Sequence, residues 1–262
     1  MESRDWYSPF GKGIMLTFEQ VCGIQGWMEP SVIPILDQIN ELQRDTIGNV
    51  VEIGVHYGKF FLFLAERLKR DECAFAVDIF ENQDENISKS GWGSLATFSS
   101  NVAALVPSAR VCILKENSIN LRDKIGLFSY NGYKARIVSV DAGHSYEEVS
   151  SDLELAQDIL HDNGVIIVDD FQHLGWDGVY QATMEFLEGP FFIPFALGGN
   201  KLLLCRTEML YHYALNMKGM SEQEYLTTVI DPPTRDKVMS VLEQYKHLIL
   251  FKEQQHLTYE NQ

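Results

Sequence analysis

The chain has 262 residues, and its 45% hydrophobic and 22% charged side chains are typical of a globular protein with a full hydrophobic core. Its formal net charge of −16 disfavours nucleic acids and anionic membranes as partners, because both are negatively charged. No apolar segment like that of a signal peptide follows residues 1–5, and no apolar run is long enough to span a membrane, so we expect a cytoplasmic protein.

Residues 1–48 are predicted to form an N-terminal segment that ends in a helix. The first 27 residues show no clear hydrophobic period. Apolar residues then recur at helical spacing after Pro30, at Val32, Ile35, Leu36, Ile39 and Leu42. We expect this helix to pack on a sheet, and the segment before it is a candidate lid over a substrate pocket.

Residues 49–207 are predicted to form a Rossmann-like α/β core. Short apolar runs alternate with helical patterns there, which indicates a mostly parallel sheet with helices on both faces. The last two runs are separated only by residues 196–201, too few for a helical crossover, so we expect them to form an antiparallel pair. Seven strands are predicted, at residues 50–54, 74–78, 111–114, 136–141, 165–169, 191–195 and 202–205.

One helix of this core has clear end signals. Ser145 and Glu148 form an S-x-x-E capping box, and residues 162–164 (Asp-Asn-Gly) are expected to stop the helix, which gives a helix over residues 146–160. Residues 208–262 are predicted to be a C-terminal helical extension, interrupted at residues 232–233 (Pro-Pro). Its apolar residues recur at helical spacing, at Val238, Val241, Leu242, Tyr245, Leu248 and Ile249. The extension either packs on its own domain or contributes to a homo-oligomer contact.

The first predicted strand leads into a candidate cofactor turn with the pattern E-x-G-x-x-x-G, formed by Glu52, Gly54 and Gly58. Glycines let a ligand approach the backbone, and the following helix directs free N–H groups at the turn. Asp78 ends the next apolar run, where an acid can accept from ribose hydroxyls. The pattern has fewer glycines than a pyrophosphate site, which favours S-adenosylmethionine over a nicotinamide dinucleotide. An ordinary βα turn is equally compatible with the glycines alone.

Three carboxylates end two further predicted strands. Asp141 follows one run, and Asp169 and Asp170 follow the next. Ligands of open parallel sheets bind at the carboxyl ends of the strands, where these acids are expected to converge. Oxygen ligands suit a hard divalent cation, magnesium before calcium or manganese. For any single aspartate, capping of the next turn is the simpler interpretation, and it is the set that indicates a metal.

Together these blocks resemble a known family. They are residues 51–54 (VEIG), Asp78, residues 140–147 (VDAGHSYE), residues 164–171 (GVIIVDDF) and residues 200–204 (NKLLL). The chain resembles class I S-adenosylmethionine-dependent methyltransferases over about residues 45–205. It resembles most closely the metal-dependent macrocin O-methyltransferase type, which methylates sugars of natural products.

The resemblance implies roles for particular residues. Asp141, Asp169 and Asp170 match the magnesium ligands. Glu52, Gly54 and Gly58 would line the methionine end of the cofactor, Asp78 would hold the ribose, and Asn117 and Ser118 would lie near the adenine. The complete implied cofactor set is Glu52, Gly54, Tyr57, Gly58, Asp78, Asn117, Ser118 and Asp141.

The chain departs from the family at one position. The usual D-G-D-H motif has a second Asp, the general base in some members, where this chain has Gly143. His144 and His173 are the candidates to replace it, because a histidine can take a proton near neutral pH. His144 is equally compatible with a structural role at the helix start, and His173 with a solvated loop. Some related enzymes place the base just past the Asp-Asp pair, which slightly favours His173.

The sequence therefore predicts an S-adenosylmethionine- and Mg²⁺-dependent O-methyltransferase that acts on a hydroxyl of a small molecule, with a sugar or polyol as acceptor. One alternative keeps the cofactor and changes the acceptor to a phenolic or polyketide hydroxyl. Another is a cofactor-binding scaffold that does not methylate, which the glycine at position 143 makes a real alternative.

Overall fold

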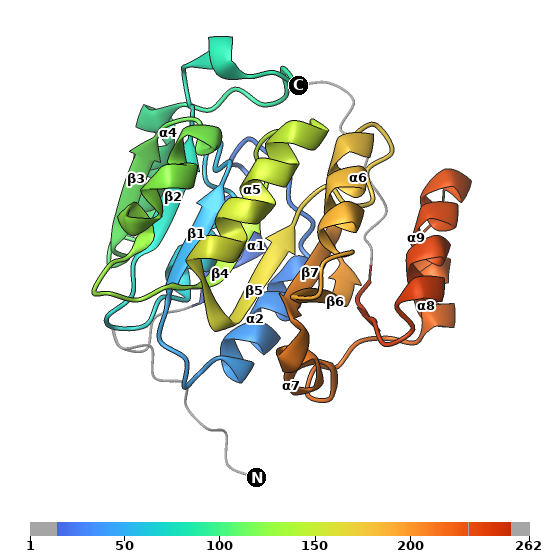
Figure 1. The fold of residues 1–262 in the computed structure, drawn as a ribbon. Helices are drawn as coiled ribbons and strands as arrows, with labels where there is room; N and C mark the ends of the chain where they lie inside the picture. Colours follow the sequence, from blue (N-terminus) through green and yellow to red (C-terminus); the bar gives the residue numbers. More distant parts are fainter. Residues whose placement is uncertain (1–14, 230, 253–262) are drawn as a thin grey trace.

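The computed structural model describes residues 15–229 and 231–252, which contain an eight-stranded sheet in the order β3-β2-β1-β4-β5-β7-β6-β8 (Figure 1). Strands β1 to β5 are parallel, β7 is antiparallel to both β5 and β6, and β8 is parallel to β6. The strands are β1 Asn49–Ile53, β2 Ala74–Asp78, β3 Val111–Lys115, β4 Ala135–Val140, β5 Leu160–Val168, β6 Phe192–Gly198, β7 Lys201–Arg206 and β8 Ile249–Leu250.

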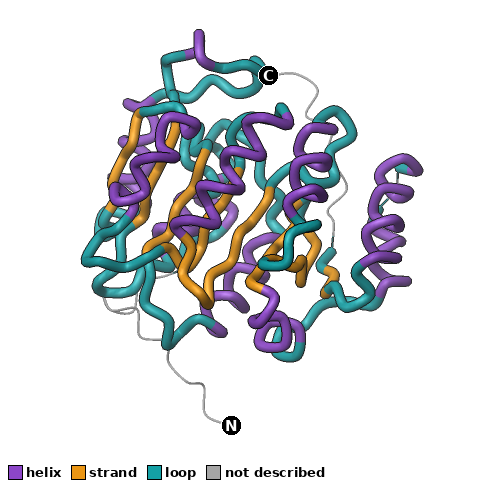
Figure 2. Tube along the Cα trace, viewed as in Figure 1, coloured by secondary structure: helices purple, strands orange, loops and turns teal. Residues whose placement is uncertain are grey.

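Helices cover both faces of the sheet, as the alternating pattern predicts (Figure 2). One face packs against η2 Ser118–Phe128, α5 Tyr146–Ile159, α6 Asp177–Phe186, α8 Glu222–Thr228 and α9 Pro232–Gln244. The other packs against α1 Phe18–Val21, α2 Val32–Leu42, α3 Phe61–Glu66, α4 Leu95–Leu105 and α7 Leu210–Ala214. Two short 3-10 turns, η1 Gln83–Glu85 and η3 Thr207–Met209, complete the described elements. The described residues contain no helix long and apolar enough to cross a membrane.

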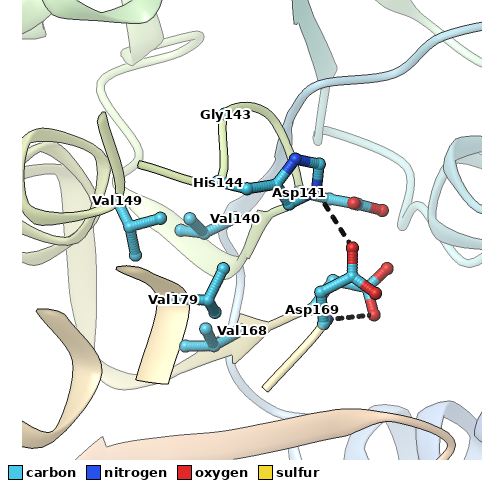
Figure 3. A pocket seen from close by; sticks show the side chains of 9 residues that line it. Val140, Asp141, Gly143, His144, Val149, Val168, Asp169 and Val179 are labelled. Atoms are coloured by element: carbon cyan, nitrogen blue, oxygen red, sulfur yellow. Dashed lines mark hydrogen bonds and ion pairs between the residues drawn. The ribbon is translucent and has the colours of Figure 1, made fainter. Parts of the chain in front are cut away.

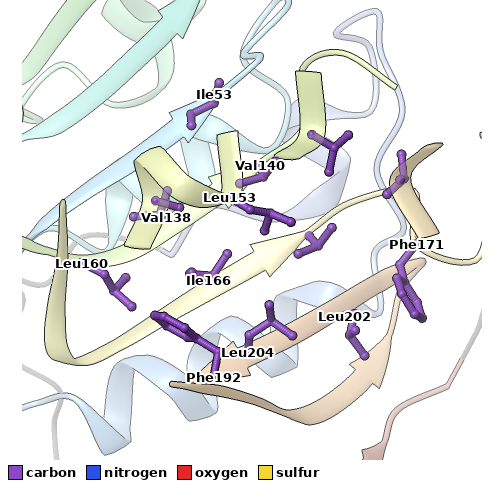
Figure 4. Packing of buried hydrophobic residues seen from close by; sticks show 14 of the residues in the cluster. Ile53, Val138, Val140, Leu153, Leu160, Ile166, Phe171, Phe192, Leu202 and Leu204 are labelled. Atoms are coloured by element: carbon purple, nitrogen blue, oxygen red, sulfur yellow. The ribbon is translucent and has the colours of Figure 1, made fainter. Parts of the chain in front are cut away.

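Alternation along the strands divides the core between the two faces. In β1, Val51 and Ile53 belong to the core under α5, where Figure 4 shows Ile53, whereas Val50 belongs to the core under α2 and α3. All three side chains are fully buried, and burial of each such side chain contributes about 1.5–3 kcal/mol. Because both faces are covered, the strands consist of continuous apolar runs, and they could therefore be predicted from the sequence.

The helix α5 begins where predicted and ends within one residue of its predicted end, but the segment that follows it is not as predicted. Ser145 and Glu148 form the capping box, with the Ser145 hydroxyl accepting from the Glu148 N–H at 3.2 Å. The helix ends at Ile159, and β5 begins at once with Leu160. Residues 162–164, predicted to be a stop outside the sheet, lie within β5. A register irregularity there takes up the extra residues, since the pairing passes from Ala135 with Leu160 to Ile137 with Val165.

The prediction of seven strands is wrong by one. The last helix of the C-terminal extension, α9, begins at Pro232 and ends at Gln244. Of the predicted helical positions beyond it, Ile249 lies in β8 and Leu248 directly precedes β8. Phe251 N–H donates to the Leu197 carbonyl at 2.9 Å, which extends the sheet beyond β6. Gly198 permits this approach, because a Cβ there would lie 2.5 Å from the Phe251 Cβ. A strand of two residues has no period for the sequence to show.

The topology brings four strand ends to one edge of the sheet. The carboxyl ends of β1, β2, β4 and β5 lie side by side there, because these strands are parallel and adjacent. The amino end of β7 joins them, since β7 is antiparallel to β5 and Leu202 pairs with Val168. The functional residues predicted from the sequence are gathered at this edge.

Candidate active site

The first βα turn, between β1 and α3, brings two strand ends into close contact. Gly54 has a φ of +90°, and a Cβ on it would lie 2.6 Å from the Ala142 Cα and overlap the Asp141 carbonyl. The Asp141 N–H donates to the Ile53 carbonyl at 2.8 Å, which joins the end of β4 to β1. Gly54 is therefore required by the approach of the protein's own β4 end, whereas the sequence interpretation assigned it to the approach of a ligand.

Contacts from α4 hold the rest of the turn. Gly58 also has a φ of +90°, and a Cβ there would lie 3.0 Å from the Phe98 ring. The Tyr57 carbonyl accepts from the Asn101 side chain at 2.9 Å, and the Tyr57 ring centroid is 4.1 Å from that of His56. The turn has a defined shape, and the role of Tyr57 and Gly58 in cofactor binding stays a prediction.

Glu52 and Asp78 are buried carboxylates at the ends of adjacent strands. Glu52 is 1% exposed, and its Oε2 has no hydrogen-bond partner among the residues that the structure describes. Burial raises the pKa of Glu52 well above its ordinary value, with the nearby Lys201 acting in the opposite direction. Asp78 accepts from the His56 N–H at 2.7 Å and from the Phe80 N–H at 2.5 Å, yet burial still raises its pKa. Both carboxylates are acceptors for donor groups of a ligand.

A lysine lies among the acids that end β4 and β5. The Lys201 Nζ is 2.5 Å from an Asp169 oxygen and 4.0 Å from an Asp141 oxygen, and it lies 4.5 Å from the Phe60 ring centroid. Lys201 is 1% exposed. Burial and the charge of Asp169 raise the pKa of Asp141 well above its ordinary value. Burial alone would lower the pKa of Lys201, but the attraction of both aspartates raises it overall, so the side chain is an ammonium.

Asp170 is turned towards different partners. Its Oδ1 accepts from the Asn200 side chain at 2.7 Å, and its Oδ2 lies 3.0 Å from the His144 Nε2. Burial would raise the pKa of Asp170, but the hydrogen bond from His144 and the positive charge of Lys201 lower it overall. Asn200 of the β6–β7 turn and Lys201, the first residue of β7, therefore engage the adjacent acids Asp170 and Asp169 separately.

The three aspartates predicted as magnesium ligands do not fit a divalent ion in this arrangement. Magnesium requires about six oxygen ligands that converge at near-octahedral geometry. The structure does bring Asp141 and Asp169 together, as expected, but the Lys201 ammonium lies against both, and Asp170 points to His144 and Asn200. Across residues 15–229 and 231–252, no three acidic, histidine or cysteine side chains form a metal-binding group.

The two candidate bases differ in their contacts. His144 lies between two polar groups, with its Nε2 at Asp170 and its Nδ1 3.0 Å from the Ser90 Oγ. An ionised Asp170 can only accept, so Nε2 carries the proton and Nδ1 of the neutral ring is an acceptor that faces the Ser90 hydroxyl. His173 uses its Nδ1 to accept from the Gly175 N–H of its own loop, at 3.1 Å. The geometry favours His144 as the base.

A small cavity lies between the ends of β4 and β5 and the helices α5 and α6, with His144 and Asp169 at its wall (Figure 3). The cavity has a volume of about 10 Å³, enough for about one water molecule. Its walls are mostly apolar, and its polar side chains are those already described.

Two loops lie beside these strand ends. Ser90 belongs to the segment after β2, and in the same segment a Cβ on Gly93 would lie 3.2 Å from an Asp78 oxygen. The segment before α2 reaches the cofactor turn, because the Lys59 Nζ donates to the Gly26 carbonyl at 2.6 Å. The α2 helix packs on the sheet, as expected. These contacts favour a covering role for the N-terminal segment, which stays a prediction.

The predicted adenine side follows β3. The Asn117 side chain accepts from the Ile119 N–H at 3.1 Å and so begins η2, and Ser118 is buried next to it. The Glu116 N–H donates to the Asp78 carbonyl, so this segment adjoins the predicted ribose residue. Behind Ser118 lies Asp152 of α5, which is 1% exposed.

Asp152 makes the stability of the protein depend on pH. Burial raises the pKa of Asp152 from 3.8 to about 7, although the Ser118 hydroxyl and Arg122 oppose the shift. Between these values the unfolded chain loses the proton and the folded chain keeps it, so the free energy of unfolding falls as the pH rises from about 4 to about 7. We expect Asp152→Asn to abolish this decrease in the free energy of unfolding, which amounts to up to about 4 kcal/mol.

Urea unfolding of the wild type and Asp152→Asn at about pH 5 and about pH 8 measures this effect. The variant should gain stability over the wild type at the higher pH, and much less at the lower. An equal difference at both pH values would show that Asp152 does not titrate in this range.

The central segment of the chain matches a family model. Residues 51–171 match the model described as a methyltransferase domain. The match begins in β1 and includes Glu52, Asp78, His144 and the pair Asp169 and Asp170. The prediction of a class I methyltransferase, the type that uses S-adenosylmethionine, is confirmed for this domain. No curated protein matches the chain significantly.

Solved structures share the fold of the methyltransferase domain. The O-methyltransferase NovP is 16% identical, with a TM-score of 0.54, covering 68% of this chain and 80% of its own. An O-methyltransferase from Bacillus cereus in complex with SAH is 16% identical, with a TM-score of 0.53, covering 71% and 88%. The O-methyltransferase TomG from Streptomyces achromogenes, in complex with SAM, is 14% identical, with a TM-score of 0.50, covering 68% and 78%. At these identities the similarity is one of fold.

Sequence reasoning missed three residues of this site. Lys201 and Asn200 were assigned only to the last strand and the connection before it, and Ser90 was given no role. A lysine at the start of an apolar strand is unusual, and this signal could have singled out Lys201. The pairing of that strand with β5, which brings Asn200 and Lys201 beside Asp170 and Asp169, was not predicted. No sequence signal indicated the contact between Ser90 and His144.

Proposed function

We propose that this protein is an S-adenosylmethionine-dependent O-methyltransferase that acts on a hydroxyl of a small molecule, with a sugar or polyol as the first acceptor class to test. The methyltransferase domain supports methyl transfer. The observation that carries the proposal is the Nδ1 of His144, which is left as an acceptor because Asp170 holds Nε2, and which faces the Ser90 hydroxyl beside the strand ends.

The chain offers a matching group for each part of the cofactor. The Glu52 Oε2, buried without a partner among the described residues, would accept from the ammonium of the methionine moiety. Each Asp78 oxygen accepts one backbone N–H and keeps a lone pair for a ribose hydroxyl. Gly54, Tyr57, Gly58 and Asp141 would line the methionine end, and residues 117–118 would adjoin the adenine.

The residues around His144 would prepare the acceptor for transfer. S-adenosylmethionine supplies an electrophilic methyl group, so the protein has to orient the acceptor hydroxyl and take its proton. The Ser90 hydroxyl marks the position of an acceptor hydroxyl, 3.0 Å from Nδ1. The proton would pass from the acceptor oxygen to Nδ1 as that oxygen takes the methyl group, the sulfur–methyl bond breaks and S-adenosylhomocysteine leaves. Asp170 would stabilise the resulting imidazolium through Nε2.

We propose no role for magnesium, although the family resemblance implies one, because Lys201 lies at the carboxylates that would bind it. A sugar or polyol acceptor is supported by the family resemblance alone, and a phenolic or polyketide hydroxyl is the alternative. The net charge of −16 supports a small-molecule acceptor over a nucleic acid or membrane partner. A cytoplasmic location, the homo-oligomer and the division at residues 48 and 207 stay predictions.

The proposal is tested by incubating the protein with S-adenosylmethionine and a panel of sugars, polyols, phenols and polyketide alcohols. Formation of S-adenosylhomocysteine with a new O-methyl signal in the acceptor's NMR spectrum would support it. Cofactor binding without transfer to any acceptor class would favour the non-methylating scaffold. The absence of cofactor binding would refute both.

Glu52→Gln provides the matched variant for cofactor binding. We expect it to weaken S-adenosylmethionine binding about tenfold or more in calorimetry, because it removes a charge-assisted hydrogen bond to the ammonium. Its melting temperature should be unchanged or higher, since a buried carboxylate with a raised pKa is lost. Glu208→Gln, an exposed change in η3 beyond the far end of β7, should bind as the wild type does. Unchanged affinity in Glu52→Gln would exclude the assigned contact.

A further inference from the structure

We infer that the Lys201 ammonium is the resident cation of the carboxylate cluster at the ends of β4 and β5, and that it takes the position which a divalent metal would otherwise occupy. The binding part of this inference concerns Asp141, Asp169 and Lys201 alone. Its consequence for catalysis rests on the proposed function.

The backbone fixes Lys201 at this place. Gly198 pairs with Lys201 across the β6–β7 turn, and the two residues between them, Gly199 and Asn200, have φ values of +63° and +60°. Positive φ at both central residues is the signature of a tight two-residue hairpin turn that sets the register of both strands. The pairing of Leu202 with Val168 then places the lysine directly beside the end of β5.

The surroundings of the ammonium are those of a bound cation. Its Nζ contacts Asp169 at 2.5 Å, has Asp141 at 4.0 Å and has the face of Phe60 at 4.5 Å from the ring centroid. A buried ammonium is stable only when paired, and here two carboxylates and an aromatic ring surround it. A divalent ion at the same carboxylates would meet a like charge at contact distance, so the lysine excludes it.

The assignment changes what the acceptor has to provide. A metal held by three carboxylates would recognise an acceptor through two adjacent hydroxyls that chelate it. An ammonium in its place donates hydrogen bonds to single oxygens instead. The proposed methyltransferase would therefore accept an isolated hydroxyl, and its activity would not depend on divalent cations.

The test is a direct metal titration that needs neither cofactor nor acceptor, so its outcome is separate from that of the proposed function. The full chain, stripped with EDTA and then freed of it, is titrated with Mn²⁺ up to about 1 mM and free Mn²⁺ is followed by electron paramagnetic resonance. We expect no stoichiometric binding by the wild type or by Lys218→Met, which changes an exposed lysine. Lys201→Met should bind about one Mn²⁺ per chain, and the double variant with Asp169→Asn should lose it.

Thermal unfolding gives a second measurement. Mg²⁺ should raise the melting temperature of Lys201→Met and leave that of the wild type unchanged, because only the variant has unneutralised carboxylates for the ion. Stoichiometric Mn²⁺ binding by the wild type that is lost in Asp169→Asn would overturn the inference, as would a folded Lys201→Met that binds no ion. Should Lys201→Met fail to fold, Lys201→Gln takes its place under the same criteria.

Discussion

Replacing His144 by glutamine is expected to slow methyl transfer about 10²–10⁴-fold while leaving S-adenosylmethionine affinity within about twofold. The reason is the pair of contacts on the ring. Asp170 accepts from Nε2 and so leaves Nδ1 as the atom that can take a proton. Nδ1 faces the Ser90 hydroxyl, whose place the acceptor hydroxyl would take. Glutamine preserves size and hydrogen bonding but cannot take up a proton near neutral pH. Single-turnover kinetics with saturating cofactor measure the effect on the transfer step.

His173→Gln is the matched control, because His173 lies in the next loop and the rings of both histidines stack on Trp176. It should retain the wild-type rate within about tenfold, because its Nδ1 is used within its own loop. The pH profile should also differ, with the rise in rate that reports the base present in the wild type and His173→Gln and absent in His144→Gln. If His173→Gln shows the larger loss, the base is His173, as the sequence slightly favoured.

Gly54→Ala is expected to lower the free energy of unfolding by more than about 3 kcal/mol, or to prevent folding altogether. The added Cβ would lie 2.6 Å from the Ala142 Cα and 2.5 Å from the Asp141 carbonyl carbon, and both are backbone atoms that no side-chain rotation can move. The φ of +90° adds strain for any residue with a Cβ. Relief of the clash would separate the ends of β1 and β4, which together carry Glu52 and Asp141. Chemical denaturation with a far-ultraviolet circular dichroism readout measures the loss.

Gly126→Ala is the control for this substitution. A Cβ on Gly126 would have no heavy atom within 4 Å, and its φ lies outside the left-handed region. It should change the free energy of unfolding by no more than about 0.5 kcal/mol. Wild-type stability in Gly54→Ala would mean that the ends of β1 and β4 do not approach as described.

Individual elements show what the sequence predicted and what only the tertiary structure decided. Apolar runs predicted the five parallel strands and the antiparallel pair, because the strands are buried on both faces. The capping box predicted the start of α5 from two side chains three residues apart. The early start of β5 and the strand β8 were not predicted, because the first depends on a register irregularity with β4 and the second on pairing with β6.

The candidate site shows the same division. The sequence by itself determined which acids end the strands and that a parallel sheet brings Asp141 near Asp169, because strand direction follows from the order of elements. Only the tertiary structure decided which way each carboxylate faces. Asp169 is paired with Lys201, and Asp170 with Asn200 and His144, through contacts between residues about 30 positions apart in the chain. Side-chain direction at converging strand ends is set by neighbours that are distant in the chain, and a local sequence pattern does not identify those neighbours.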